Sequence, residues 1–219
     1  MKKINFWEFK EELKFLKSKK IFNKLKKTLE SGEIFFGKTL KKFEKNFLNF
    51  NKTRYGLSVK NGTDALILSL MCAGIKKGDE VITVSLTAIP TISSIVTVGA
   101  VPVFVDVNNK CLIDVDQIEK KISNKTKAII PVHLYGQPCE LNKILKIAKK
   151  YKLKVIEDCA QSFGAKYSNK FVGNYGDFGC FSFYPTKIFG AYGDGGFIST
   201  NNEILYDKMK RIRFLGMEK

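Results

Sequence analysis

Several features that would point to particular classes of protein are missing from the sequence. The five cysteines are scattered and form no close pair, which excludes the paired spacing of a zinc site and the disulfide framework of a small secreted domain. Free thiols in a reducing compartment are therefore expected, and no metal. No stretch reaches the roughly 20 apolar residues of a membrane span. The basic start, MKKINFWEFKEE, has no apolar run behind it and indicates no signal peptide, so the sequence predicts a cytoplasmic protein.

Acidic residues are also few. The 38 Lys and Arg residues outnumber the 21 Asp and Glu residues, which gives a formal net charge of +17. Such a charge suits nucleic acid, anionic lipid or an anionic substrate. However, no basic-aromatic motif of nucleic-acid recognition is present, and many lysines near the start alternate with Leu, Phe and Ile at helical spacing. We interpret them as the solvated face of amphipathic helices, and expect neither nucleic acid nor membrane as a partner.

The pattern of apolar residues predicts an α/β fold. A basic helical segment is expected at residues 1–30 and a larger domain at 31–219. In the larger domain, strands that are apolar nearly throughout alternate with helices, which predicts a mostly parallel sheet with helices on both faces. Ligands bind such sheets beyond the carboxyl ends of the strands, so functional residues are expected just after strands. The predicted strands are 81–84, 102–105, 128–132, 154–156, 179–183 and 196–199, and the predicted helices are 5–31 with a break near Ser18, 39–50, 64–73, 91–98, 116–122, 141–151 and 205–214.

One candidate binding site is the turn Asn61-Gly62-Thr63-Asp64, which leads into an apolar helix. Free backbone N–H groups, a hydroxyl and the positive end of the helix dipole together suit a phosphate group. The alternative is an ordinary helix cap formed by Thr63 or Asp64.

A second candidate is the pair Glu157-Asp158, which follows a buried strand, with Gln161 three residues further on. A carboxylate at such a place is costly to bury unless it meets a cation or hydrogen-bond donors. A pyridine nitrogen is such a partner, because a carboxylate keeps it protonated and strengthens the ring as an electron sink. A helix cap is again the alternative.

The third and fourth candidates follow each other. An apolar strand delivers Ser182 and then Lys187, in Phe-Ser-Phe-Tyr-Pro-Thr-Lys, into a turn. A lysine surrounded by Phe, Tyr, Pro and Ile would be poorly solvated, which leaves its amine nucleophilic, although a surface lysine is the commoner case. The glycine-rich run 190–196 allows close backbone approach or a tight turn.

Taken in order, these motifs resemble those of the DegT/DnrJ/StrS family of sugar-nucleotide aminotransferases, which use pyridoxal 5'-phosphate (PLP). The resemblance covers residues 31 to 217 and is most specific around the lysine. The matching strings are NGTDAL, EDCAQSFGA, FSFYPTKIFGAYGDGG, SGEIFFGKTLKKFEKNF, GDEVITVS, GAVPVFVDV and VHLYGQP.

The resemblance implies the large domain of PLP fold type I, the aspartate-aminotransferase-like fold, in a homodimer. It implies Lys187 as the Schiff-base lysine, Asp158 at the pyridinium nitrogen and Gln161 at the phenolic oxygen of the ring. It further implies that the phosphate is held by a cradle of Gly62, Thr63, Asp64 and Ser182. The implied reaction transfers an amino group, with glutamate as the expected donor, to a keto-deoxysugar nucleotide in surface-polysaccharide or deoxysugar biosynthesis.

Two departures from the family pattern stand out. The aromatic residue that commonly stacks on the cofactor matches Ala88, which has no ring. Family members also continue for about as long again, so the C-terminal small domain and an asparagine-containing segment are expected to be missing, as in a fragment or a truncated gene product. The rival interpretations are therefore a catalytically silent remnant and a basic binding module on the same scaffold. The only histidine, His133, is interpreted as a strand-end packing residue or a minor ring contact.

Overall fold

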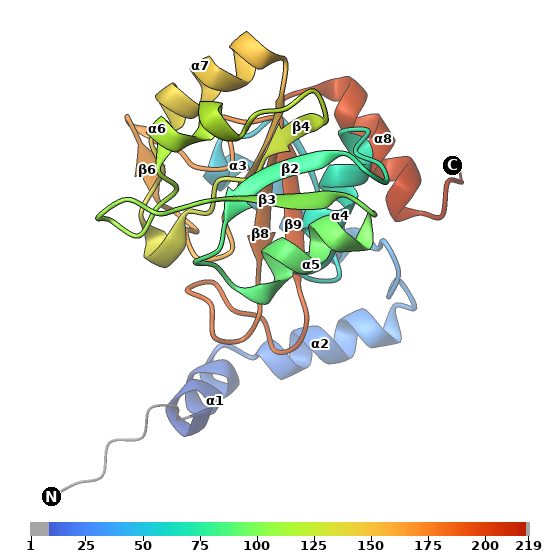
Figure 1. Ribbon diagram of the computed structural model, residues 1–219. Helices are drawn as coiled ribbons and strands as arrows, with labels where there is room; N and C mark the ends of the chain where they lie inside the picture. The colour runs from blue at the N-terminus through green and yellow to red at the C-terminus, as the bar shows by residue number, and fades with distance from the viewer. Residues whose placement is uncertain (1–8, 218–219) are drawn as a thin grey trace, which may run out of the picture. The chain divides into compact units, whose positions relative to one another are not determined.

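The computed structural model describes residues 9–217 (Figure 1). The chain divides into two compact units, Met1–Lys45 and Asn46–Lys219. The division falls inside helix α3 (Lys38–Asn51).

The first unit contains α1 (Phe9–Ser18) and α2 (Ile21–Glu30). The two helices are separated at Lys20, whose φ of 53° places it in the left-handed region, so the predicted break near Ser18 is confirmed. The lysines of both helices are exposed, as expected of a solvated face. Residues 5–8 of the predicted helix lie outside the described part of the chain.

A seven-stranded sheet forms the centre of the second unit, in the order β1-β9-β8-β5-β4-β2-β3. Strand β9 runs antiparallel to both of its neighbours, and the remaining pairs are parallel, so the predicted mostly parallel sheet is confirmed. The strands are β1 (Tyr55–Val59), β2 (Glu80–Val84), β3 (Val101–Val105), β4 (Thr126–Ile129), β5 (Lys154–Asp158), β8 (Phe178–Ser182) and β9 (Gly196–Thr200).

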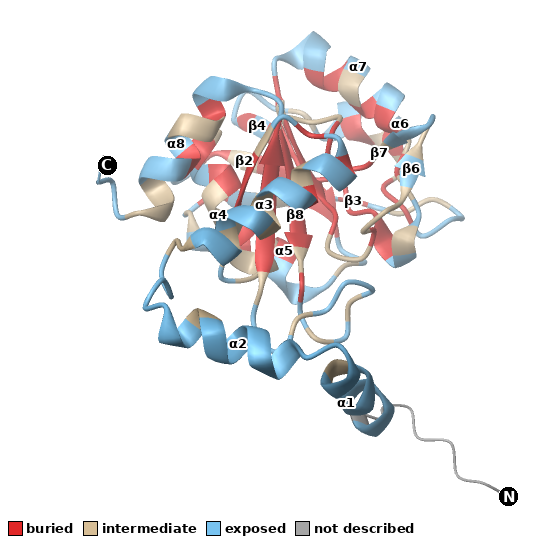
Figure 2. Cartoon of the chain, turned by 180° about the vertical axis from the view of Figure 1, so that it is seen from behind, coloured by how far each residue is buried: buried red, intermediate tan, exposed pale blue. Residues whose placement is uncertain are grey.

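Helices cover both faces of this sheet (Figures 1 and 2). Neighbouring strand residues such as Val81 and Ile82 point to opposite faces and join two separate hydrophobic clusters, which explains why these strands are apolar throughout. One cluster contains residues of α4 (Gly62–Cys72), α5 (Ile89–Thr97) and α8 (Glu203–Arg213). The other contains residues of α6 (Val115–Ile118) and α7 (Leu141–Tyr151).

Stacked phenylalanine rings fill the space between α3 and the strands β8 and β9. Phe47 of α3 lies over Phe197 of β9, with ring centroids 4.1 Å apart. The stack continues outward to Phe163 and then to Phe189, whose centroids are 4.7 Å apart with an angle of 14° between the rings. These contacts tie the loop after β8 to the segment after β5.

Some predicted elements differ in extent or were missed. Strand β4 ends at Ile129 instead of residue 132, because Pro131 has no N–H group to continue the ladder. The predicted helix 116–122 divides into α6 and a short 3-10 helix, Glu119–Lys121. Strand β1, the hairpin β6 (Lys166–Tyr167) with β7 (Lys170–Phe171), and the 3-10 turn Leu134–Gly136 were not predicted.

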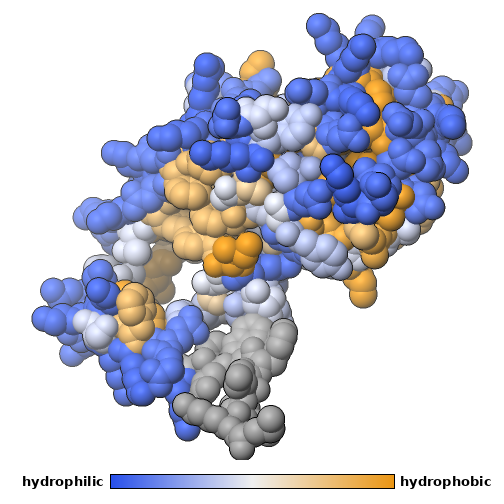
Figure 3. Space-filling view, turned by 90° about the vertical axis from the view of Figure 1, so that its left-hand side faces the viewer, coloured by the Kyte–Doolittle hydropathy of each residue, from blue (hydrophilic) through white to orange (hydrophobic). Residues whose placement is uncertain are grey.

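The surface agrees with the composition. On the face drawn in Figure 3, hydrophilic side chains cover much of the surface, with apolar residues exposed between them. Within residues 9–217, no helix is long and apolar enough to cross a membrane. All five cysteines are free, and four of them are buried.

Candidate active site

The amino end of α4 is capped by Asn61. Its side-chain oxygen accepts a hydrogen bond of 2.8 Å from the backbone N–H of Asp64. The alternative cap by Thr63 or Asp64 is therefore wrong, and the half-buried side chains of these two residues are not used to cap the helix. The first turn of a helix also leaves backbone N–H groups without intrahelical acceptors, so this end of α4 offers donors and a positive dipole to an anion.

Close backbone packing brings this helix end to the end of strand β8. A Cβ atom added to Gly62 would lie 2.7 Å from the Cβ atom of Ser182. On the neighbouring strand, Gly196 is paired with Ser182 and lies against the backbone of Asn61. Gly62 is thus required for steric reasons, and the predicted cradle residues Gly62, Thr63, Asp64 and Ser182 lie together.

Asp158 is the last residue of β5 and is only 5% exposed. Its Oδ1 atom accepts a hydrogen bond from the N–H of Ala160 at 3.1 Å, and its Oδ2 atom accepts one from the Thr91 hydroxyl at 2.8 Å. No helix follows in the described segment 159–165, so the alternative that Asp158 caps a helix is wrong.

Burial raises the pKa of the Asp158 carboxyl above its ordinary value. The hydrogen bonds from Ala160 and Thr91 oppose this rise, as do His133 and the positive charge of Lys187. The charge of Lys187 therefore acts on Asp158, although 29 positions in the sequence separate them. A cation placed at this carboxyl would relieve the cost of its burial.

Gln161 lies on the turn that follows Asp158 and is half-buried. Its Oε1 atom accepts a hydrogen bond of 2.9 Å from the backbone N–H of Tyr135. Because a backbone N–H can only donate, the atom facing it must be the oxygen, and the amide nitrogen Nε2 points elsewhere as a donor. Such a donor suits an oxygen acceptor, as the predicted contact with a phenolic oxygen requires.

Lys187 lies in a loop between β8 and β9. Two backbone hydrogen bonds close the base of this loop, from the N–H of Phe183 to the carbonyl of Gly195 and from the N–H of Ala191 to the carbonyl of Phe183. Lys187 is half-buried, but the expected apolar collar does not form, because Tyr184 and Ile188 are 55% and 78% exposed on the turn. The stack of Phe189 on Phe163 anchors the loop instead.

A buried polar group lies behind Asp158. Glu157 accepts hydrogen bonds from the backbone N–H groups of Gly173, Tyr175 and Gly176 at 2.7 to 2.8 Å. His133 accepts one at Nδ1 from the N–H of Cys139, so its proton is on Nε2, which donates to Glu157 at 3.1 Å. His133 is fully buried with both nitrogens engaged, which agrees with the predicted strand-end packing role and leaves no nitrogen for a ring contact.

Ligand-type atoms of His133, Glu157 and Cys159 lie within 4.8 Å of one another, as in a metal site. However, hydrogen bonds already occupy the histidine nitrogens and the glutamate oxygens. Burial raises the pKa of the Cys159 thiol to about 12, which disfavours the thiolate that a metal would bind. We therefore interpret His133, Glu157 and Cys159 as a hydrogen-bonded part of the core and not as a metal site.

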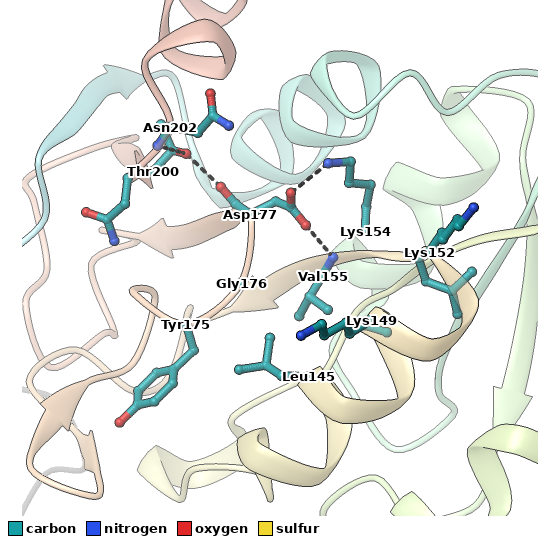
Figure 4. A pocket seen from close by; sticks show the side chains of 13 residues that line it. Leu145, Lys149, Lys152, Lys154, Val155, Tyr175, Gly176, Asp177, Thr200 and Asn202 are labelled. Atoms are coloured by element: carbon teal, nitrogen blue, oxygen red, sulfur yellow. Dashed lines mark hydrogen bonds and ion pairs between the residues drawn. The ribbon is translucent and has the colours of Figure 1, made fainter.

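A separate open hollow lies at the opposite edge of the sheet, where the parallel strands begin (Figure 4). Lys154 and Val155, at the start of β5, and Asp177, just before β8, line it. The carboxylate of Asp177 is held by the amine of Lys154 at 2.8 Å and by the N–H of Val155 at 2.9 Å. Asp158, at the far end of β5, takes no part in this hollow.

Sequence reasoning missed the contacts of three residues. Asn61 was part of the candidate turn, but its role as the cap was not predicted, although asparagine before an apolar helix is a preferred cap. Thr91 and Tyr135 had no recognisable signal, since each reaches Asp158 or Gln161 only through the folded chain.

The fold and this arrangement define the large domain of a PLP-dependent transferase of fold type I. The structure of NtdA from Bacillus subtilis with bound cofactor PMP matches 98% of this chain and 48% of its own, with a TM-score of 0.89 and 35% identity. The chain belongs to the DegT/DnrJ/EryC1/StrS aminotransferase family, whose sequence profile it matches over residues 16–219.

Two relatives illustrate the family. The dTDP-3-amino-3,4,6-trideoxy-alpha-D-glucose transaminase of Micromonospora megalomicea subsp. nigra is 41% identical over 90% of this chain and 53% of its own length. The GDP-perosamine synthase of Escherichia coli O157:H7 is 46% identical over 83% of this chain and 50% of its own length. The chain thus spans about half the length of these relatives.

Proposed function

We propose that the protein is a PLP-dependent aminotransferase that transfers an amino group from glutamate to a keto-deoxysugar nucleotide. The observation that carries the proposal is that the parallel neighbours β5 and β8 end at Asp158 and at Ser182, which packs against Gly62, so Gln161 and Lys187 follow at the same edge of the sheet. The names of the relatives, which act on dTDP- and GDP-linked sugars, support the substrate class. We also propose a cytoplasmic homodimer that serves surface-polysaccharide or deoxysugar biosynthesis.

The residues present fit PLP. The amino end of α4 is capped by Asn61 and packs so closely against Ser182 that Gly62 has no room for a side chain. Its backbone N–H groups can donate to the phosphate group. Asp158 is a buried carboxylate that would gain from a cationic partner such as a protonated ring nitrogen. Gln161, three residues after Asp158, accepts from Tyr135 with its oxygen and so offers its amide nitrogen as a donor.

Each side chain has a distinct task in this proposal. When bound, PLP supplies the electron sink for the exchange of amino groups. Lys187 holds the cofactor through Nζ and then moves protons as a general acid and base. Asp158 would keep the ring nitrogen protonated, and Gln161 would donate to the ring oxygen. Thr63, Asp64, Ser182 and the N–H of Gly62 orient the phosphate.

Trapping the cofactor on its lysine tests the proposal. The natural-length protein is incubated with PLP, reduced with borohydride, digested and analysed by mass spectrometry. The expected result is an adduct on Lys187 that Lys187→Ala abolishes, while Lys166→Ala, at an exposed lysine in the hairpin β6–β7, leaves it in place. An adduct that persists on another lysine in Lys187→Ala would overturn the assignment.

An assay of amino transfer completes the test. With glutamate and a keto-deoxysugar nucleotide, Lys187→Ala is expected to lose at least about 100-fold in turnover, the lower end of what a general acid and base contributes. Absence of any PLP adduct in the wild-type protein would favour the basic binding module. An adduct without turnover on any keto sugar nucleotide would favour a silent remnant.

A further inference from the structure

Asp158, the acid proposed to hold the ring nitrogen, is itself held by a residue outside every motif that pointed to the site. Thr91 lies in the first turn of α5, is 1% exposed, and donates its hydroxyl proton to Oδ2 of Asp158 at 2.8 Å. The other oxygen, Oδ1, accepts from the N–H of Ala160. Together the two bonds fix the plane of the carboxylate.

A second hydroxyl stands behind the first. Oγ1 of Thr87, a half-buried residue in the loop between β2 and α5, lies 2.8 Å from Oγ1 of Thr91. A hydroxyl has one proton to donate, and an ionised carboxylate can only accept. Since Thr91 donates to Asp158, Thr87 must donate to Thr91. The direction of this hydroxyl chain is therefore set by the charge on Asp158.

We infer that Thr91 is a positioning residue that orients the Asp158 carboxylate and keeps it ionised, and that Thr87 supports it from the β2–α5 loop. The inference rests on the proposed function, because the task of Asp158 is defined there.

The surrounding groups favour this assignment. The hydroxyl of Thr91 is one of the contacts that oppose the rise in the pKa of Asp158 caused by burial. Burial also raises the pKa of the nearby Cys159 and Cys180 thiols, which therefore stay neutral across the working range of pH. The remaining titratable groups around Asp158 are Lys187, from the loop after β8, His133 beyond β4, and Glu157, which is already bound by three N–H groups.

The test compares Thr91→Val, which removes the hydroxyl but keeps the shape, with Thr91→Ser, which restores it. In Thr91→Val of the natural-length protein, kcat is expected to fall about 10-fold or more, as for loss of a hydrogen bond to a charged group. The acid limb of the pH profile should move upward by about one pH unit, because Asp158 needs a higher pH to ionise. The pH titration of the visible absorption band of bound PLP should shift in the same direction, and Thr91→Ser should reverse each change.

A matched control and a double mutant separate positioning from general stability. Thr83→Val removes another fully buried threonine hydroxyl, one that donates to the carbonyl of Ile130 in the sheet, and should leave the pH profile unchanged. Thr91→Val added to Asp158→Asn should cost little further activity, because Thr91 acts through Asp158. If Thr91→Val does not fold, Thr87→Val is expected to produce the same shifts on a smaller scale.

Failure of the inference about Thr91 can be distinguished from failure of the proposed function. Wild-type protein without a PLP adduct contradicts the aminotransferase itself. Wild-type protein that binds PLP and transfers amino groups, with a Thr91→Val pH profile and spectrum like those of the wild type, contradicts only the role of Thr91. Equal and additive losses in the double mutant would likewise overturn it.

Discussion

At Asp158 a carboxyl group is buried where the proposed chemistry needs a negative charge. Burial alone raises the pKa of this group, and two hydrogen bonds and the charge of Lys187 recover part of the cost. The buried charge of Asp158 therefore serves the proposed catalysis but destabilises the fold. A cation bound beside the carboxylate would reduce this cost.

Replacing Asp158 by Asn should separate these two effects. The expected turnover falls by orders of magnitude, about 100-fold or more, because the ring nitrogen loses its carboxylate. Without PLP, however, the variant should be more stable than the wild type at neutral pH. In the folded wild type the pKa of Asp158 is raised, so the wild type loses stability as the pH rises toward that pKa. The difference in stability between the variant and the wild type should vanish below about pH 4, where the carboxyl is protonated in both the folded and the unfolded state.

Urea unfolding of the PLP-free proteins over a range of pH checks this prediction. Asp116→Asn, which removes a similar charge at an exposed position, is the matched control and should show no such trend. Wild-type turnover in Asp158→Asn, or a stability difference that does not depend on pH, would contradict it.

Single residues can be predicted from the sequence where the signal is local. Gly62, Asp158 and Lys187 remain predictions of this kind, because each follows an apolar strand or precedes an apolar helix. Thr91 does not stand out, because a threonine in an apolar helix is ordinary and its partner is 67 positions away. The exposure of Tyr184 and Ile188 was also missed, since sequence neighbours on a turn need not point the same way.

At the scale of elements, the carboxylate of Glu157 organises the whole connection between β7 and β8. Three N–H groups of residues 173–176 converge on its two oxygens, and His133 adds a fourth contact. Backbone donors in a buried turn have no neighbouring strand to pair with, so this one side chain replaces a hydrogen-bond ladder.

Glu157→Gln should therefore loosen this connection. An amide keeps the size of the side chain but has one acceptor oxygen, so that at least one buried N–H is left unpaired, at a cost of about 1–3 kcal/mol. Hydrogen exchange at the amides of Gly173, Tyr175 and Gly176 should accelerate, and the free energy of unfolding should fall. Glu119→Gln, which breaks an ion pair with Lys150 on the surface, should cause no comparable loss. Unchanged exchange at all three amides would show that Glu157 does not hold the turn.

Most strands and helices were predictable, because burial on both faces makes a strand apolar throughout. Strand β1 was the main omission. Only Gly56 and Leu57 of its five residues are buried, so it lacks the apolar run of the other strands. Its place in the sheet depends on Gly56, where a Cβ would lie 2.4 Å from the ring of Phe197, a contact that no local pattern reveals.

At the scale of the whole molecule, the net charge of +17 is the dominant long-range effect. The described ion pairs mostly involve exposed side chains, which neutralise few of the lysines and contribute little stability individually. The remaining positive charges repel one another across the surface.

Added salt should therefore stabilise the protein. Raising NaCl from about 10 mM to about 150 mM shortens the screening length from roughly 30 Å to roughly 8 Å, which weakens repulsion between distant lysines. We expect the melting temperature to rise over this range, as measured by circular dichroism at constant pH. A melting temperature that stays constant or falls with salt would mean that attractive pairs outweigh the repulsion.

The position of β9 has a consequence for the order in which the protein folds on the ribosome. Strand β1 pairs with β9 alone, so residues 55–59 have no strand partner until residues 196–200 have been synthesised. Strands β2 and β3, by contrast, can pair as soon as residue 105 has emerged. Closing a contact over about 140 residues is slow, because chain entropy must be lost before any bond is gained. The amino end of α4 follows β1 directly. It is therefore expected to pack against Ser182 late, after the parallel strands have assembled.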